Sequence, residues 1–200
     1  MFHRLRAAAG CVLIVLLCVL AASLGGTRAI TYNGETVYFT VVNDAMLELS
    51  YSSMPVMSDG RIYVPYTLFV NYFDVKSVYS ASDQVLFLSN ASKIVKFDMK
   101  RGIAYDRNQN EIRQAALIFH DQVYVPAEFT AGYFGLSYAL LPDASIVRLY
   151  DGRATYIDAF LAGQFSARME EMLARLQVQT AATTSAPATS SLSTGTALPT

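Results

Sequence analysis

An internal repeat constrains the fold of this chain more than any other feature of its sequence. The segment Asp59–Pro65 (DGRIYVP) resembles His120–Pro126 (HDQVYVP), an offset of 61 residues from position 59 to position 120. Further matches at the same offset are Tyr72-Phe73 with Tyr133-Phe134, and Val85–Leu88 with Ile146–Leu149. A shared pattern at one constant offset predicts two copies of one structural unit, at about residues 55–105 and 116–152.

Each unit predicts the same order of strand, helix, strand and strand. A polar turn leads into a β-branched and aromatic strand that ends at Val-Pro, where proline stops the strand and favours a first helical turn. A short helix and two strands follow. Gly135 suits the left-handed end of the second helix, and Asp74 holds that place in the first unit. With an opening hairpin at Asn33-Gly34, residues 30–152 are predicted to form an α+β domain of antiparallel strands and two short helices.

The first 29 residues have the pattern of an export segment. Residues 7–26 carry no charge, and His3, Arg4 and Arg6 precede them. A basic start, an apolar run and then small residues are typical of a signal peptide, with cleavage expected after Ala29. The alternative is an uncleaved membrane anchor, because about 20 apolar residues suffice to cross a bilayer. Both interpretations place residues 30–200 outside the cytoplasm, in the cell envelope or the extracellular space.

Two further segments follow the repeats. Residues 153–177 predict an amphipathic helix, because an apolar stripe recurs at intervals of three and four along 154–177. The members of the stripe are Ile157, Leu161, Phe165, Met169, Met172, Leu173 and Leu176. The helix either packs on the sheet of its own chain or pairs with another copy, as in a coiled coil, or with a partner. Residues 178–200 are rich in Ser, Thr, Ala and Pro, have no charge, and predict a disordered tail.

Few residues of the exported part suit catalysis. Both cysteines, Cys11 and Cys18, lie in the export segment, so residues 30–200 offer no disulfide and no thiolate. His120 is the only histidine after that segment, and a turn position explains it. Asp106–Asn110 begins like a calcium loop, but Glu111 stands where such a loop needs glycine. We therefore predict no catalytic, cofactor-binding or metal-binding residues, and the net charge of -1 argues against a nucleic-acid partner.

Three motifs resemble the copper amine oxidase N-terminal-like domain, also called a stalk domain. They are Asn33-Gly34-Glu-Thr-Val37, Gly60-Arg-Ile-Tyr-Val-Pro65 and Gln122-Val-Tyr-Val-Pro126. The Leu-Arg that usually follows proline in this family is Tyr66-Thr67 in the first unit and Ala127-Glu128 in the second. The resemblance covers about residues 30–152. It implies a non-catalytic stalk, and a secreted or wall-associated protein of Gram-positive bacteria.

Two functions are consistent with these features. The first is a non-catalytic envelope module that acts as a stalk or serves attachment or assembly, with cell-wall glycan or another envelope protein as its partner, or with self-association through helix 154–177. Aromatic platforms formed by the 13 tyrosines could stack on sugar rings, but positions in half-buried strands explain the tyrosines better. The second is an enzyme that acts on wall polysaccharide through an unrecognised pair of carboxylates. The scarcity of His and Cys favours the first.

Overall fold

The predicted repeat is present in the structure, because the two units have the same order of strands and helix. A computed structural model of the chain describes residues 31–32, 35–50 and 54–184. The first unit contains β5 (Val56–Ser58), β6 (Arg61–Pro65), α2 (Thr67–Tyr72), β7 (Lys76–Ser80) and β8 (Val85–Ser89). The second contains β12 (Leu117–Phe119), β13 (Gln122–Pro126), α3 (Ala127–Phe134), β14 (Ser137–Leu141) and β15 (Ile146–Tyr150). Each unit thus begins with a hairpin, one strand more than the sequence predicted.

Left-handed backbone positions also recur at the repeat offset. The matching pairs of residues with positive φ are Asp59 with His120, Gly60 with Asp121, Asp74 with Gly135, and Gln84 with Ser145. Two successive positive φ angles between short antiparallel strands are typical of a type I′ hairpin turn. The backbone therefore requires the same conformations in both units, even where only one unit supplies glycine.

The two units pair with each other through their Tyr-Val-Pro strands. β6 and β13 are antiparallel, and Val64 faces Val125, its own counterpart in the repeat. Around this pair, Tyr63 faces Pro126 and Pro65 faces Tyr124, so the pairing has approximate two-fold symmetry. The outer hairpin strands complete a four-stranded sheet in the order β12-β13-β6-β5.

Each unit contributes its second hairpin to a different sheet. The β7–β8 hairpin continues into β9 (Ile94–Asp98), β10 (Ile103–Asp106) and β11 (Glu111–Ile112), which gives five strands. The β14–β15 hairpin joins β3 (Phe39–Val42) and β4 (Ala45–Met46), with β3 parallel to β15. β1 (Thr31–Tyr32) and β2 (Glu35–Thr36) form the expected opening hairpin, and a 3-10 turn spans Pro142–Ala144.

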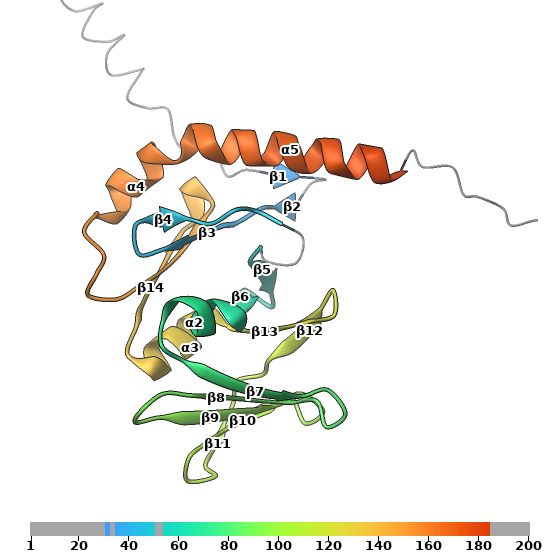
Figure 1. Cartoon of the computed structure of the whole chain (residues 1–200), viewed down its shortest axis with the longest axis vertical. Coiled ribbons are helices and arrows are strands. Elements are labelled where there is room, and N and C mark those ends of the chain that lie inside the picture. Colours follow the sequence, from blue (N-terminus) through green and yellow to red (C-terminus); the bar gives the residue numbers. More distant parts are fainter. Residues whose placement is uncertain (1–30, 33–34, 51–53, 185–200) are drawn as a thin grey trace, which may run out of the picture.

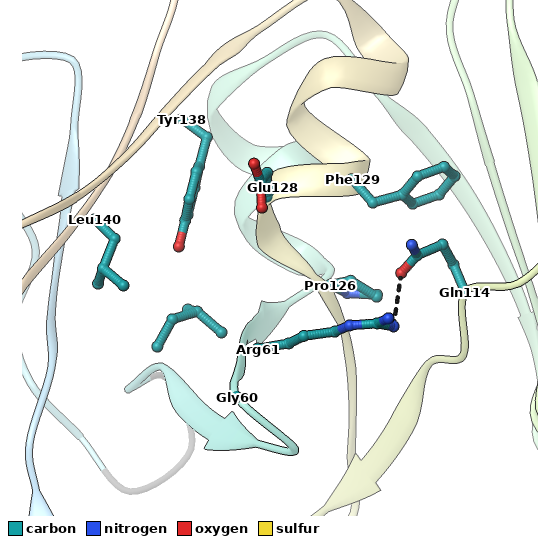
Figure 2. Close-up of a pocket in the computed structure, with 9 residues that line it drawn as sticks. Gly60, Arg61, Gln114, Pro126, Glu128, Phe129, Tyr138 and Leu140 are labelled. Atoms are coloured by element: carbon teal, nitrogen blue, oxygen red, sulfur yellow. Dashed lines mark hydrogen bonds between the residues drawn. The ribbon is translucent and has the colours of Figure 1, made fainter.

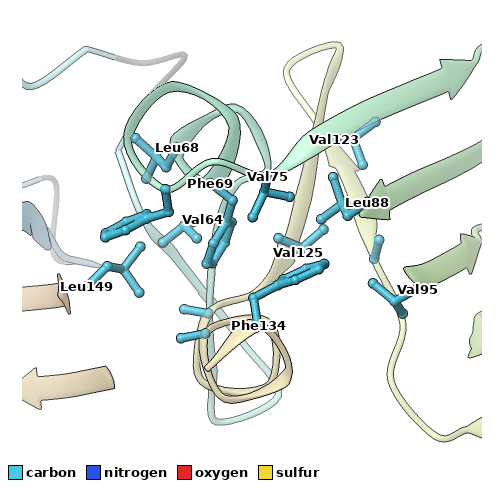
Figure 3. Close-up of a cluster of buried hydrophobic side chains, with 14 of the residues drawn as sticks. Val64, Leu68, Phe69, Val75, Leu88, Val95, Val123, Val125, Phe134 and Leu149 are labelled. Carbon is cyan, nitrogen blue, oxygen red and sulfur yellow. The ribbon is translucent and has the colours of Figure 1, made fainter. Parts of the chain in front are cut away.

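The main core lies between these sheets and the two repeat helices (Figures 1 and 3). Phe69 of α2 and Phe134 of α3 meet Val64 and Val125 there, with Leu149 and Leu88 approaching from the two outer sheets. The residues of β8 and β15 that point into the core are equivalent in the repeat. The same apolar positions are therefore buried in both units. The predicted α+β class with mostly antiparallel strands is confirmed.

The C-terminal helix differs from its prediction in three ways. It begins at residue 158 rather than 154, it is divided into α4 (Asp158–Gln164) and α5 (Ser166–Thr184), and it runs seven residues past the predicted end at 177. Residues 178–184, predicted to be disordered, are therefore helical. The remaining predictions for 1–29 and 185–200 lie outside the described residues.

α4 and α5 cover the outer face of the sheet that contains β3 and β15 (Figure 1). Leu161, Met169, Met172 and Leu173 form a second apolar cluster with Phe39, Val41 and Ile146. Packing on the sheet of its own chain is the first of the two predicted arrangements for this helix. Ile157 was predicted to belong to the stripe, but it precedes α4 and is 72% exposed. On α5, Glu171 and Arg175 form an i, i+4 ion pair at 2.6 Å.

Candidate functional site

A buried arginine makes four hydrogen bonds within the chain. Arg148 lies in β15 and is 2% exposed. Its Nη1 donates to Asp158 Oδ1 at 2.6 Å, its Nη2 to Asp44 Oδ1 at 2.9 Å, and its Nε to the backbone oxygen of Asn43 at 3.0 Å. The guanidinium carbon also lies 4.5 Å from the centre of the Tyr150 ring. Because its hydrogen bonds are made within the chain, Arg148 ties β15, the β3–β4 turn and α4 together rather than offering a site to a ligand.

Asp44 connects the same cluster to the segment between β15 and α4. Its carboxylate accepts hydrogen bonds from Thr155 Oγ1 at 2.6 Å, from Thr155 N at 2.7 Å and from Tyr156 N at 3.2 Å. These hydrogen bonds, led by that of the Thr155 hydroxyl, lower the pKa of Asp44, and the charge of Arg148 lowers it further. The charged form of Asp44 thus holds the covering segment in place.

A pocket of about 370 Å³ lies where the second repeat helix meets the β5–β6 turn (Figure 2). α3 supplies Glu128 and Phe129, β14 supplies Tyr138 and Leu140, and β6 supplies Arg61. Arg61 Nη1 donates to Gln114 Oε1 at 3.3 Å, which fixes two polar side chains at one side of the pocket. Figure 2 shows Glu128 between Tyr138 and Phe129. This mixture of apolar walls and a few converging polar groups is typical of small-molecule sites.

The polar groups of this pocket offer both donors and acceptors. Burial, with smaller contributions from Glu128 and Tyr38, raises the pKa of Tyr138 to about 12. Its hydroxyl therefore stays protonated at neutral pH and can donate as well as accept. Among the described residues that line the pocket, Glu128 is the single carboxylate. Glycoside hydrolysis normally uses a pair of carboxyl groups, so the pocket suits binding better than cleavage.

Of the residues considered from the sequence, His120 lies in a turn, as predicted, and Asp106 ends β10 and leads into the next turn. His120 is exposed in a type I′ turn, with φ of 46°, and its ring packs on Phe119 at 4.3 Å. Asp106 closes the β10–β11 turn by accepting from the backbone nitrogens of Asn108 and Asn110, at 2.8 and 2.9 Å. A hydrogen bond from the Asn110 side chain has the largest effect in lowering the pKa of Asp106, and the two backbone hydrogen bonds lower it further. The loop is thus a hairpin turn that uses its carboxylate internally.

Among the described residues, the exposed tyrosines lie on separate segments of the chain. Tyr63 and Tyr124, the repeat-equivalent pair, are both buried, whereas Tyr72, Tyr79 and Tyr156 are exposed on separate elements. The sequence-based alternative that tyrosines fit half-buried strands agrees with this placement. Tyr138 is the tyrosine that lines the candidate pocket, and nothing in the repeat pattern distinguishes it from the others.

Sequence reasoning missed two residues that matter here. Arg148 interrupts the apolar run Ile146–Leu149 at the position of Phe87 in the first unit, and a lone charge in a buried strand is a usable signal. Glu128 stands where the family pattern has arginine, and this reversal of charge marks the candidate pocket. Gln114 carries no signal, because it lies between the repeats.

The arrangement of the described side chains does not support a metal site. Within residues 31–32, 35–50 and 54–184, no three residues of the types His, Cys, Asp and Glu lie close enough together to hold a metal ion. His120 is the one histidine in these ranges, so an imidazole site for copper does not fit.

None of the helices in the described part of the chain is both long and apolar enough to cross a membrane.

The fold is a two-repeat α+β domain with a pocket lined by α3, β14 and β6. The family model for the copper amine oxidase N-terminal domain matches residues 41–143, and the chain belongs to this family. In amine oxidases this domain is a non-catalytic, stalk-like part of the protein. No curated protein and no solved structure was found to match the chain.

Proposed function

We propose that the chain is a non-catalytic module of the cell envelope that holds wall glycan in the pocket between Arg61, Glu128 and Tyr138. The observation that carries the proposal is the lining of this pocket: an exposed carboxylate, a protonated phenol and the Arg61–Gln114 pair beside Phe129 and Leu140. Sugars present hydroxyl groups that both donate and accept, together with apolar ring faces. The two kinds of lining group complement these two surfaces.

Two further observations support an envelope role. The uncharged run at residues 7–26 predicts export, and the family's N-terminal domain is stalk-like and non-catalytic. A spacer needs a stiff body, and the shared core of two repeats and two outer sheets supplies one. Attachment to glycan through one pocket would then set the position of whatever the chain carries.

The proposal is tested by sedimentation of the full chain with insoluble wall glycan. We expect Glu128→Gln and Tyr138→Phe each to weaken retention about five- to tenfold, the cost of one hydrogen bond to a ligand. The repeat-equivalent changes Thr67→Val and Ser77→Ala are matched controls and should leave retention unchanged. The absence of retention for the unmodified chain would contradict glycan binding. Release of new reducing ends from the glycan would contradict the non-catalytic role.

A further inference from the structure

Three arginines surround a second cavity, on the other side of Arg61 from the glycan pocket. This cavity has a volume of about 460 Å³ and is lined by Arg61, Arg101 and Arg113, with Asp59 as its one acidic residue. The arginines come from three separate segments: the start of β6, the β9–β10 turn and the segment that follows β11. The fold therefore brings together three positive charges that are distant in sequence.

None of these arginines forms an ion pair with a carboxylate of the described residues. Arg61 donates to the neutral Gln114, and the guanidinium of Arg101 lies 5.8 Å from the centre of the Tyr105 ring. By contrast, Arg148, Arg153, Arg168 and Arg175 each pair with an acid within 4.0 Å. Guanidinium groups that surround one cavity and form no ion pair with a described carboxylate repel each other, and an anion placed between them would relieve that repulsion.

We infer that this arginine cavity binds the oxyanion groups, phosphate or carboxylate, of an anionic polymer. Arginine matches both anions through two parallel hydrogen bonds. The cavity is open, and its three arginines come from different segments, so successive anionic groups of one soluble polymer can reach them together. The net charge of -1 for the whole protein leaves this cavity as a local positive site rather than part of a general basic surface. The inference concerns a different ligand from the neutral glycan of the first pocket.

Binding of the full chain to two soluble probes tests the inference: inorganic polyphosphate and poly-glutamate. We expect Arg101→Gln and Arg113→Gln each to weaken binding about three- to tenfold. Each should also reduce the slope of log K against log salt by about one. Arg107→Gln is the matched control, because Arg107 is exposed on the β10–β11 turn, outside the cavity lining, and its loss changes net charge equally. It should change the affinity by less than about twofold.

The outcomes separate the possible anions and the two proposals. Binding of either polymer with this dependence on Arg113 supports the inference and shows whether phosphate or carboxylate is preferred. Equal weakening by Arg107→Gln, or no binding of either polymer, would overturn it. So would binding confined to vesicles of anionic lipid. Retention on wall glycan stripped of anionic polymers, measured on Arg113→Gln, should be unchanged, so failure here leaves the glycan pocket untouched.

Discussion

The two repeats share one backbone but differ in what covers their outer sheet faces. In the second unit Ile146 and Arg148 point outward from β15 and are buried under α4 and α5. Of their counterparts on β8 in the first unit, Val85 is also buried, but Phe87 is 41% exposed and its cross-strand neighbour Val78 is 68% exposed. The repeat therefore specifies the fold of each unit, and the segments outside the repeat decide which face becomes interior.

The candidate pocket also differs between the two units. Glu128 and Tyr138 correspond to Thr67 and Ser77 at the repeat offset, so the first unit lacks both the carboxylate and the phenol. Positions that are alike in the two units, such as Val64 with Val125, lie in the core. Positions that differ in chemistry supply the charged and phenolic groups of the pocket, and they supply Arg148. Comparison of the units thus separates residues that serve folding from those with a specific role.

The largest effect is expected at the outward position of β15. Replacing Arg148 with alanine leaves Asp44 and Asp158 without their partner and empties a buried site, at a cost of about 3 kcal/mol of unfolding free energy. Phe87→Ala at the equivalent position removes a part-exposed ring and should cost only about 1 kcal/mol. Denaturant unfolding of both variants checks the difference. Equal costs in unfolding free energy would contradict the claim that this outward position is interior in the second unit and open in the first.

A smaller effect is expected at the ends of the repeat helices. Gly135 has φ of 78° and Asp74 has φ of 33°, so both occupy the left-handed region that disfavours side chains. Open space surrounds the position of a Cβ at Gly135, so only the backbone penalises its replacement. Gly135→Asp should destabilise by about 1 kcal/mol, and Asp74→Gly should stabilise by about 0.5 kcal/mol. Thermal unfolding measures both, and the same sign for the two changes would refute the equivalence.

The smallest effect is expected on the stability of the fold at acidic pH. Hydrogen bonds from Thr155 lower the pKa of Asp44, so the folded state releases its proton more readily than the unfolded chain, where the pKa is about 3.9. The stabilisation from this group is complete above that value and is lost as the pH falls through the lower folded pKa. Asp44→Asn should therefore flatten the decline of stability below about pH 4. A denaturation midpoint followed with pH tests this, and an unchanged slope would contradict it.

Local patterns predicted the elements, because turns, Val-Pro strand ends and apolar alternation act over a few residues. They could not predict that Val64 pairs with Val125, or that β3 joins β15 in parallel, because pairing across such distances leaves no local signal. Gly163 weakens the end of α4, which stops at Gln164, yet the periodicity of the stripe suggested one continuous helix. The candidate pocket depends on contacts among α3, β14 and β6, so only the departure at Glu128 pointed to it.

Nuclear magnetic resonance of the labelled full chain during titration with a soluble wall-glycan fragment tests the central claim most directly. The account predicts chemical-shift changes at Gln114, Glu128 and Tyr138, and none at Thr67 and Ser77, the counterparts in the first repeat. Changes of similar size in both repeats, or changes confined to the open face around Val78 and Phe87, would contradict it.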